Sequence, residues 1–150
     1  TITHILPLED INKGLTTAQA FIDQGADVIL PVAGQVGEGA ARAALDSGTA
    51  SIIWVDSDGY DTLSPDFRPV LLTSVLKNTG SAVVEIVKTS IDDTFDNAPF
   101  IGTLENGGVG IAPFHDLAPR VSAELSAEID QLRSDIVAGT IVVTSPSTPR

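Results

Sequence analysis

The fold is decided by residues 26–45, which read ADVILPVAGQVGEGAARAAL. Within this stretch, residues 28–33 form an unbroken apolar run that is short enough for a strand and too continuous for one face of an exposed sheet. We therefore predict a buried parallel strand at 28–33. Gly34, Gly37 and Gly39 follow, and the apolar residues after them recur at helical spacing. The stretch predicts a strand that runs through a glycine turn into a helix.

The glycine turn is the first candidate for a functional site. In open parallel sheets, ligands bind at the carboxyl ends of the strands, and a helix N-terminus offers unpaired N–H groups to an oxygen-rich ligand. A turn needs glycines whether or not a ligand is near, so the turn alone does not establish a function. Two nucleotide motifs are excluded, because the spacing is G-x-x-G-x-G rather than G-x-G-x-x-G and no Gly-Lys-Ser/Thr follows.

The composition excludes several classes of function. The chain has 150 residues, the length of one ordinary domain. Its 20 acidic and 8 basic residues give a net charge of -12, which repels phosphate backbones, so we expect no nucleic-acid partner. Cysteine is absent from the sequence, which excludes disulfides and thiolate chemistry. His4 and His115 are the two histidines, and no second ligand lies at metal spacing from His4. We expect no metal and no cofactor.

Strands and helices alternate along the chain, which predicts an α/β fold with a parallel sheet, flanking helices and right-handed crossovers. Trp54, the single tryptophan, is expected in the core. The remaining predicted elements are, in order, a strand at 1–6, a helix capped by Asp10 or Asn12 and ending at Gly25, strands at 51–55 and 70–76, a helix at 79–91, a hairpin of 100–104 with 109–112, a last helix closed by Gly139, a strand at 141–143 and a Pro/Ser tail at 145–150.

An acidic turn follows the strand at 51–55. Asp56, Asp58 and Asp61 place three carboxylates within six residues. A calcium loop is disfavoured, because Gly59 comes two places early and Tyr60 occupies a ligand position. Three interpretations stay open: a catalytic pair, a carboxylate that accepts paired hydrogen bonds from sugar hydroxyls, and a solvated turn capped by its own side chains.

Three successive predicted strands end in residues that suit a polar ligand. Gly34, Asp56 and Lys77 follow or end these strands, and parallel strands bring such ends to one edge of the sheet. A backbone amide, a carboxylate and an ammonium group at one edge can hold a polyhydroxylated ligand. We therefore predict that these three residues converge on one side of a cleft.

Four ordered motifs between about residue 11 and residue 143 also carry a resemblance. They are GADVI with PVAG at 25–34, WVDSDGY at 54–60, LTSVLKN at 72–78, and GTL with NGGVGIAPF at 102–114. With these motifs the chain resembles the basic membrane lipoprotein (BMP) family, the substrate-binding proteins of ABC importers that include purine nucleoside receptors.

The resemblance implies a type I periplasmic-binding fold, of which this chain is the C-terminal lobe. It implies that residues 78–98 pack on an N-terminal lobe outside this chain and that 144–150 form a flexible tail. It further implies an extracytoplasmic full-length lipoprotein, anchored to the membrane through a lipid. The expected partners are an ABC permease and a nucleoside-like small molecule held between two lobes.

The resemblance also implies the site residues. The positions that hold the ribose hydroxyls in the family fall on Gly34, Asp56 and Lys77. The family's Gly-Gly-Thr/Ser-Gly turn is altered here to Gly34-Gln35-Val36-Gly37, and the amide of Gln35 means that the ligand need not be a purine nucleoside. We therefore expect no catalytic residue, no enzyme activity and a ligand-binding set of Gly34, Gln35, Asp56, Asp58 and Lys77.

Two other classes of function stay open. One is a small α/β enzyme that acts on a sugar or nucleoside through Asp56, Asp58 and Lys77, and the other is a structural or regulatory domain that has lost binding. The helix at 79–91 would leave its apolar face uncovered in this chain. We therefore expect the chain to pair with a second copy by exchanging this segment, or with a separate N-terminal fragment.

Overall fold

The computed structural model describes residues 10–145 of the chain. The described residues fall into two compact units, one of residues 10–76 with 111–120 and one of residues 77–110 with 121–145. The predicted opening strand at 1–6, with His4, and the tail beyond residue 145 lie outside the described residues.

The sheet follows the predicted parallel order. Strands β1 (Val28–Ile29), β2 (Ser51–Asp56) and β3 (Leu71–Lys77) are parallel neighbours in chain order, and Asp56 pairs in register with Leu76. Strand β4 (Val109–Ile111) is the next neighbour of β3. It runs antiparallel to β3, because Ala112 N donates to Ser74 O and Asn78 N donates to Gly108 O, each at 2.9 Å. The predicted fold class is confirmed, with one antiparallel addition.

The first strand is shorter and more exposed than predicted. Only two residues of the apolar run form β1, and Val32 beyond it is 74% exposed. The strand ends before Pro31, which has no N–H to donate to a neighbouring strand. Within the described part of the chain, β1 also has a hydrogen-bonded neighbour on one side only. The prediction of a buried strand at 28–33 was therefore wrong in burial and length, but right in its parallel direction.

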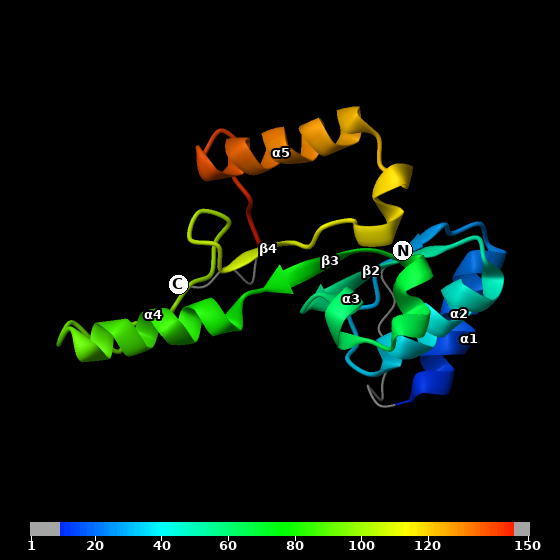
Figure 1. Ribbon diagram of the computed structural model, residues 1–150, viewed down its shortest axis with the longest axis horizontal. Helices are drawn as coiled ribbons and strands as arrows, with labels where there is room; N and C mark the ends of the chain where they lie inside the picture. Colours follow the sequence, from blue (N-terminus) through cyan, green and yellow to red (C-terminus); the bar gives the residue numbers. More distant parts are fainter. Residues whose placement is uncertain (1–9, 146–150) are drawn as a thin grey trace. The chain divides into compact units, whose positions relative to one another are not determined.

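In the first unit, one helix packs on β2 and a second helix packs on the first (Figure 1). Helix α1 (Ile11–Asp23) begins as predicted at Asp10, whose carboxylate accepts a hydrogen bond of 3.1 Å from Lys13 N. Helix α2 (Val36–Ser47) ends at Gly48, which has a left-handed backbone. The core is built from small side chains of α2 against large ones of the strands. It includes Ala40, Ala41, Ala43, Ala44, Ile52, Leu71 and, as predicted, Trp54.

The glycines of residues 34–39 have two separate roles, which corrects the prediction of one glycine turn. Gly34 alone lies in the turn, with φ of 54°. Gly37 and Gly39 lie inside α2, where they permit close packing. A Cβ atom on Gly37 would lie 2.7 Å from the Trp54 ring, and one on Gly39 would meet the backbone of α1 at Ile11 O.

Residues 57–70 are not an open loop, because two polar side chains start short helices there. Asp58 caps α3 (Gly59–Thr62) by accepting a hydrogen bond from Tyr60 N. Ser64 caps the 3₁₀ helix η1 (Pro65–Val70), in which Pro65 takes the first position. A second 3₁₀ helix, η2 (His115–Arg120), completes the first unit.

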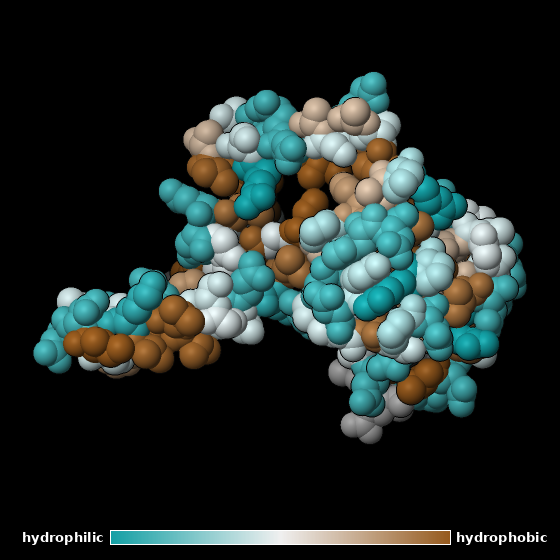
Figure 2. All heavy atoms as spheres, viewed as in Figure 1, coloured by the Kyte–Doolittle hydropathy of each residue, from teal (hydrophilic) through white to brown (hydrophobic). Residues whose placement is uncertain are grey.

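The second unit holds the two other predicted helices, α4 (Thr79–Ile91) and α5 (Ala123–Val137). Ser122 caps α5 by accepting a hydrogen bond from Leu125 N, and Gly139 follows the helix with φ of 74°. Neither helix has a buried residue among those described. Hydrophobic side chains therefore lie on the surface along α4 (Figure 2).

The predicted hairpin of 100–104 with 109–112 was wrong, although its turn is present. Residues 100–104 form no strand, because the side chain of Asn106 uses their backbone groups. Asn106 Oδ1 accepts from Thr103 N at 2.8 Å and from Gly108 N at 2.9 Å, and Asn106 Nδ2 donates to Ile101 O at 2.9 Å. Strand β4 pairs with β3 instead.

The predicted strand at 141–143 was also wrong. These residues are exposed and extend no sheet in the described structure, and Ile141 N donates to Asp135 O at the end of α5. Across residues 10–145, no helix combines the length and the apolar character needed to cross a bilayer.

Candidate functional site

Asp56 stands at the carboxyl end of β2 in a strained backbone conformation. Its φ is 71°, which is rare for a residue other than glycine. Ser57 N donates to Val55 O at 2.9 Å, so the chain forms a three-residue γ-turn centred on Asp56. A γ-turn with positive φ at its centre is the rare and strained form. Strain of this kind clusters at ligand sites, and the side chain of Asp56 is exposed there.

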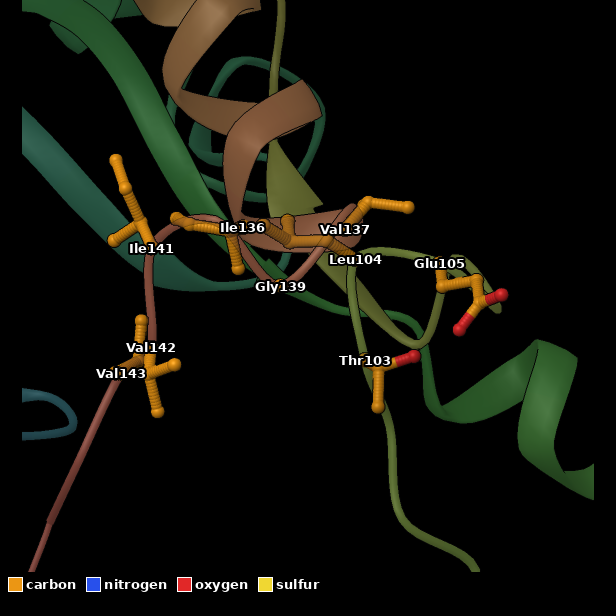
Figure 3. Close-up of a pocket in the computed structure, with 9 residues that line it drawn as sticks. All are labelled: Thr103, Leu104, Glu105, Ile136, Val137, Gly139, Ile141, Val142 and Val143. Carbon is orange, nitrogen blue, oxygen red and sulfur yellow. The ribbon is translucent and has the colours of Figure 1, made fainter.

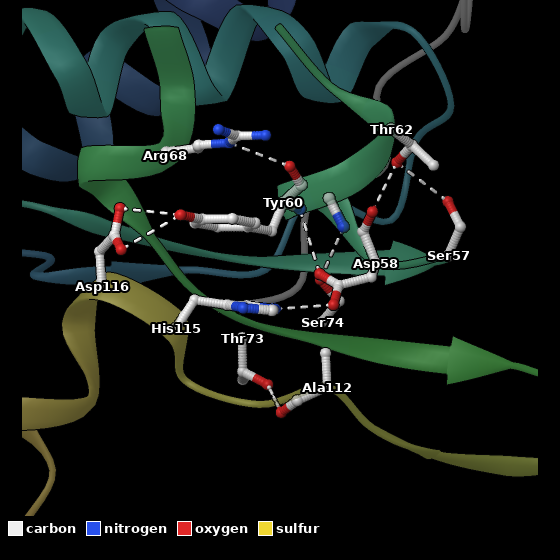
Figure 4. Close-up of polar contacts among 11 residues, drawn as sticks. Ser57, Asp58, Tyr60, Thr62, Arg68, Thr73, Ser74, Ala112, His115 and Asp116 are labelled. Carbon is white, nitrogen blue, oxygen red and sulfur yellow. Dashed lines mark hydrogen bonds and ion pairs between the residues drawn. The ribbon is translucent and has the colours of Figure 1, made fainter. Parts of the chain in front are cut away.

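Asp58, two residues later, is held by three partners in the first unit (Figure 4). Its Oδ1 accepts hydrogen bonds from Tyr60 N at 3.1 Å and from Ser74 Oγ at 3.3 Å. Its Oδ2 lies 2.7 Å from His115 Nε2. Ser74, a buried residue of β3, also accepts a hydrogen bond of 3.0 Å from Gly59 N. These contacts join the start of α3 to β3 and to the start of η2.

Tyr60 forms a stack beside this carboxylate (Figure 4). Its ring lies on that of His115, with centroids 4.1 Å apart and planes 13° apart. The Arg68 guanidinium lies 4.3 Å from the ring centroid on the other face. The Tyr60 hydroxyl donates to the Asp116 carboxylate at 3.1 Å. Desolvation, and then this hydrogen bond to Asp116, raise the pKa of the Tyr60 hydroxyl above its ordinary value.

The N-terminus of α2 offers fewer N–H groups than the sequence predicts. Gly37 N donates to Gly34 O and Glu38 N donates to Gln35 O, each at 3.0 Å. Gln35 is exposed, has helical backbone angles and makes no capping hydrogen bond through its side chain. Part of the N–H set expected for a ligand is thus used within the turn.

Lys77 ends β3 as predicted and belongs to the second unit. In the first unit, Asp56 pairs in register with Leu76, the residue before Lys77 in the chain. The convergence of Gly34, Asp56 and Lys77 on one side of a cleft stays a prediction.

An apolar pocket lies in the second unit (Figure 3). It has a volume of about 330 Å³, and none of the five predicted ligand-binding residues lines it. The residues around it are Thr103, Leu104, Glu105, Ile136, Val137, Gly139, Ile141, Val142 and Val143. No group of three or more acidic or histidine side chains that could hold a metal ion occurs within residues 10–145.

Sequence reasoning missed the contact of Asp58 with His115. The two residues are 57 positions apart, and no local pattern links them. The sequence offers one general hint, since His115 and Asp116 lie between Pro113 and Pro119, and closely spaced prolines indicate a turn.

Comparison with known proteins identifies the family. The family described as "ABC transporter substrate-binding protein PnrA-like" matches residues 6–147. The chain belongs to this Bmp family. The resemblance carried by the four motifs is thereby confirmed, and the family is one of substrate-binding proteins rather than of enzymes.

Known relatives of this Bmp-family chain are longer than it is. Basic membrane protein A of Borreliella burgdorferi is 32% identical over 140 residues, which are 91% of this chain and 39% of that protein. An ABC transporter solute-binding protein of Conexibacter woesei has a TM-score of 0.72 at 19% identity, over 90% of this chain and 43% of that one.

Two other solved structures share the fold. A solute-binding protein of Aeropyrum pernix has a TM-score of 0.74 at 21% identity, over 92% of this chain and 45% of that one. A transcriptional activator of the comK gene from Bacillus halodurans has a TM-score of 0.76 at 18% identity, over 94% and 47%. The Bmp-family chain thus spans less than half the length of each of these proteins.

Proposed function

We propose that the complete protein is the substrate-binding component of an ABC importer and that it binds a ribonucleoside or a close analogue between two lobes. Membership of the PnrA-like family supports the transport role. On this proposal the present chain supplies the C-terminal lobe, and the complete protein is an extracytoplasmic lipoprotein that delivers its ligand to a permease.

One observation in the structure carries the assignment of the ligand class. Asp56 stands in a strained γ-turn at the carboxyl end of a central parallel strand, where ligands of open α/β sheets bind. A carboxylate there accepts hydrogen bonds from the two neighbouring hydroxyls of a ribose. Lys77 would donate to the same sugar, and Gly34 would let the ligand approach the backbone. Gln35, exposed at the start of α2, would contact a more distant part of the ligand.

The alternative of an enzyme that uses Asp56, Asp58 and Lys77 is less favoured. Both carboxylate oxygens of Asp58 have partners in the described structure, and one of these is the capping hydrogen bond of α3. This arrangement suits a positioning role for Asp58 better than acid or base catalysis. On this proposal Asp58, predicted as a ligand-binding residue, supports the site rather than contacting the ligand.

Calorimetry on the complete protein tests the proposed ligand class. We expect saturable binding of at least one ribonucleoside without turnover. The matching 2′-deoxyribonucleoside should bind about tenfold more weakly or worse, because Asp56 would lose one hydroxyl partner in a closed site. Free ribose is the control for the contribution of the base. Equal affinity for the ribo and deoxy forms, no binding by any nucleoside, or conversion of the ligand would contradict the proposal.

A further inference from the structure

Two residues with unusual backbone conformations, Asp56 and His115, are connected through Asp58. Asp56 has φ of 71° and His115 has φ of 43°, although neither is a glycine. Asp58 connects them, because it follows Asp56 by two residues and its Oδ2 lies 2.7 Å from His115 Nε2. The side chains of His115 and Asp58 are 23% and 19% exposed, so water screens their contact only partly.

The ends of the γ-turn are fixed by different parts of the first unit. On one side, Val55 lies in β2 and pairs in register with Val75 of β3. On the other side, Asp58 is held by Ser74 Oγ and by the imidazole of His115 (Figure 4). The short segment between Val55 and Asp58 then has little freedom to leave the strained form. A strained backbone persists only where its surroundings determine it in this way.

The orientation of the imidazole is itself fixed. The Tyr60 ring stacks on the His115 ring, with the ring centroids 4.1 Å apart. His115 is the first residue of η2, and its positive φ sets the direction in which its side chain leaves the backbone. Histidine adopts this backbone region more readily than most residues do. The contact with Asp58 is thus made by a ring that is already in place, which lowers the entropic cost of making it.

We propose that His115 is a positioning residue, which fixes Asp58 and thereby holds the γ-turn of Asp56 in the conformation that binds ligand. The ligand part of this inference rests on the proposed function. The conformational part does not, because it concerns only the γ-turn and the contact of His115 with Asp58 within this chain. The two parts are therefore tested by different measurements.

Two variants of the complete protein weaken the same contact from either side. His115→Asn keeps a residue that tolerates positive φ, but its shorter side chain does not reach Asp58. Asp58→Asn keeps a residue that caps helices well, but removes the charge from the contact with His115. Because each variant preserves a different part of the local structure, the proposal stays testable if one of them fails to fold.

Hydrogen exchange of the ligand-free protein is the first readout. We expect the Ser57 amide, which closes the γ-turn, to exchange about tenfold faster in either variant. The amide of Ile52, a core residue with 0% exposure, should be unchanged. The double variant should exchange no faster than the more affected single variant, because both substitutions break one contact. Unchanged exchange at Ser57, or equal acceleration at Ser57 and Ile52, would overturn the proposal.

Ribonucleoside affinity is the second readout, and the control variant lies in α3, the helix that Asp58 caps. We expect about tenfold weaker binding in His115→Asn and partial recovery in His115→Gln, whose longer side chain restores an N–H donor. Asp61→Asn changes an exposed residue of α3 outside these contacts, and it should match the wild type in both readouts. Wild-type affinity in His115→Asn would overturn the role in binding. If the wild type itself binds no nucleoside, the proposed function fails while the exchange data still decide the role of His115.

Discussion

The packing of α1 against α2 depends on single glycine residues. A Cβ atom on Gly39 would meet the backbone of α1 at Ile11 O and, at 2.6 Å, at Leu15 N. Backbone atoms of a packed helix do not move aside as a flexible side chain would, so a methyl group at this position must separate the two helices.

The substitution Gly39→Ala in the 150-residue chain should therefore lower the free energy of unfolding by about 1–3 kcal/mol, measured by urea denaturation. The matched control is Gly80→Ala in α4, where a Cβ atom would have no neighbour within 4 Å. That substitution should leave stability unchanged or raise it by up to about 1 kcal/mol. Equal effects at the two positions would show that α1 and α2 do not need the close approach.

The sequence predicts some residue roles and not others, for physical reasons. Trp54 could be assigned to the core because a large aromatic ring within an apolar strand is favoured where it is buried. The roles of Gly37 and Gly39 could not be separated from that of Gly34, because glycines near a helix start serve a turn and close packing equally well. The contact of His115 with Asp58 depends on the folded chain and has no local signal.

Among the helices and strands, α4 shows the clearest conflict between an apolar sequence and an exposed position. Its apolar side chains remain on the surface, with Val83 59% and Val87 50% exposed (Figure 2). Full burial of each such side chain is worth about 1.5–3 kcal/mol, so an uncovered face of this kind favours association. We propose that in the isolated chain a second copy covers it by exchange of the segment that follows Lys77-Asn78.

Light scattering of the 150-residue chain at micromolar concentration tests this proposal. We expect a mass of about twice 15.6 kDa for the wild type. The double variant Val83→Gln with Val87→Gln introduces good helix formers and removes apolar surface, so it should shift the mass towards the monomer. A monodisperse wild type at 15.6 kDa would defeat the idea.

Helices were predicted more accurately than the short strands outside the central sheet. The helix at 79–91 has the predicted bounds, because hydrophobic periodicity is a property of the segment itself. The predicted pairing of 100–104 failed, because a hairpin signal around Asn106 does not reveal that its side chain will bond the backbone on both sides. Strand pairing depends on residues that are distant in the sequence, and here β4 pairs with β3.

For the whole molecule, the fold class was predictable from the alternation of apolar strands and helices, and the family from four ordered motifs. The candidate site was less predictable, since its contacts join groups from distant parts of the chain. Asp56 has the position expected from the end of β2, while its strained γ-turn and the contact of His115 with Asp58 became visible only in the structure.

The central claim is that Asp56 binds the sugar of the ligand, and calorimetry of the complete protein with its best ribonucleoside tests it most directly. Asp56→Ala should weaken binding by about 2 kcal/mol or more, roughly thirtyfold, because two sugar hydroxyls would lose their acceptor in a closed site. The control is Asp46→Ala, which removes an exposed carboxylate of α2 paired with Arg42 and should leave affinity unchanged. Equal affinities of the wild type and Asp56→Ala would contradict the claim and leave Asp56 as a turn residue alone.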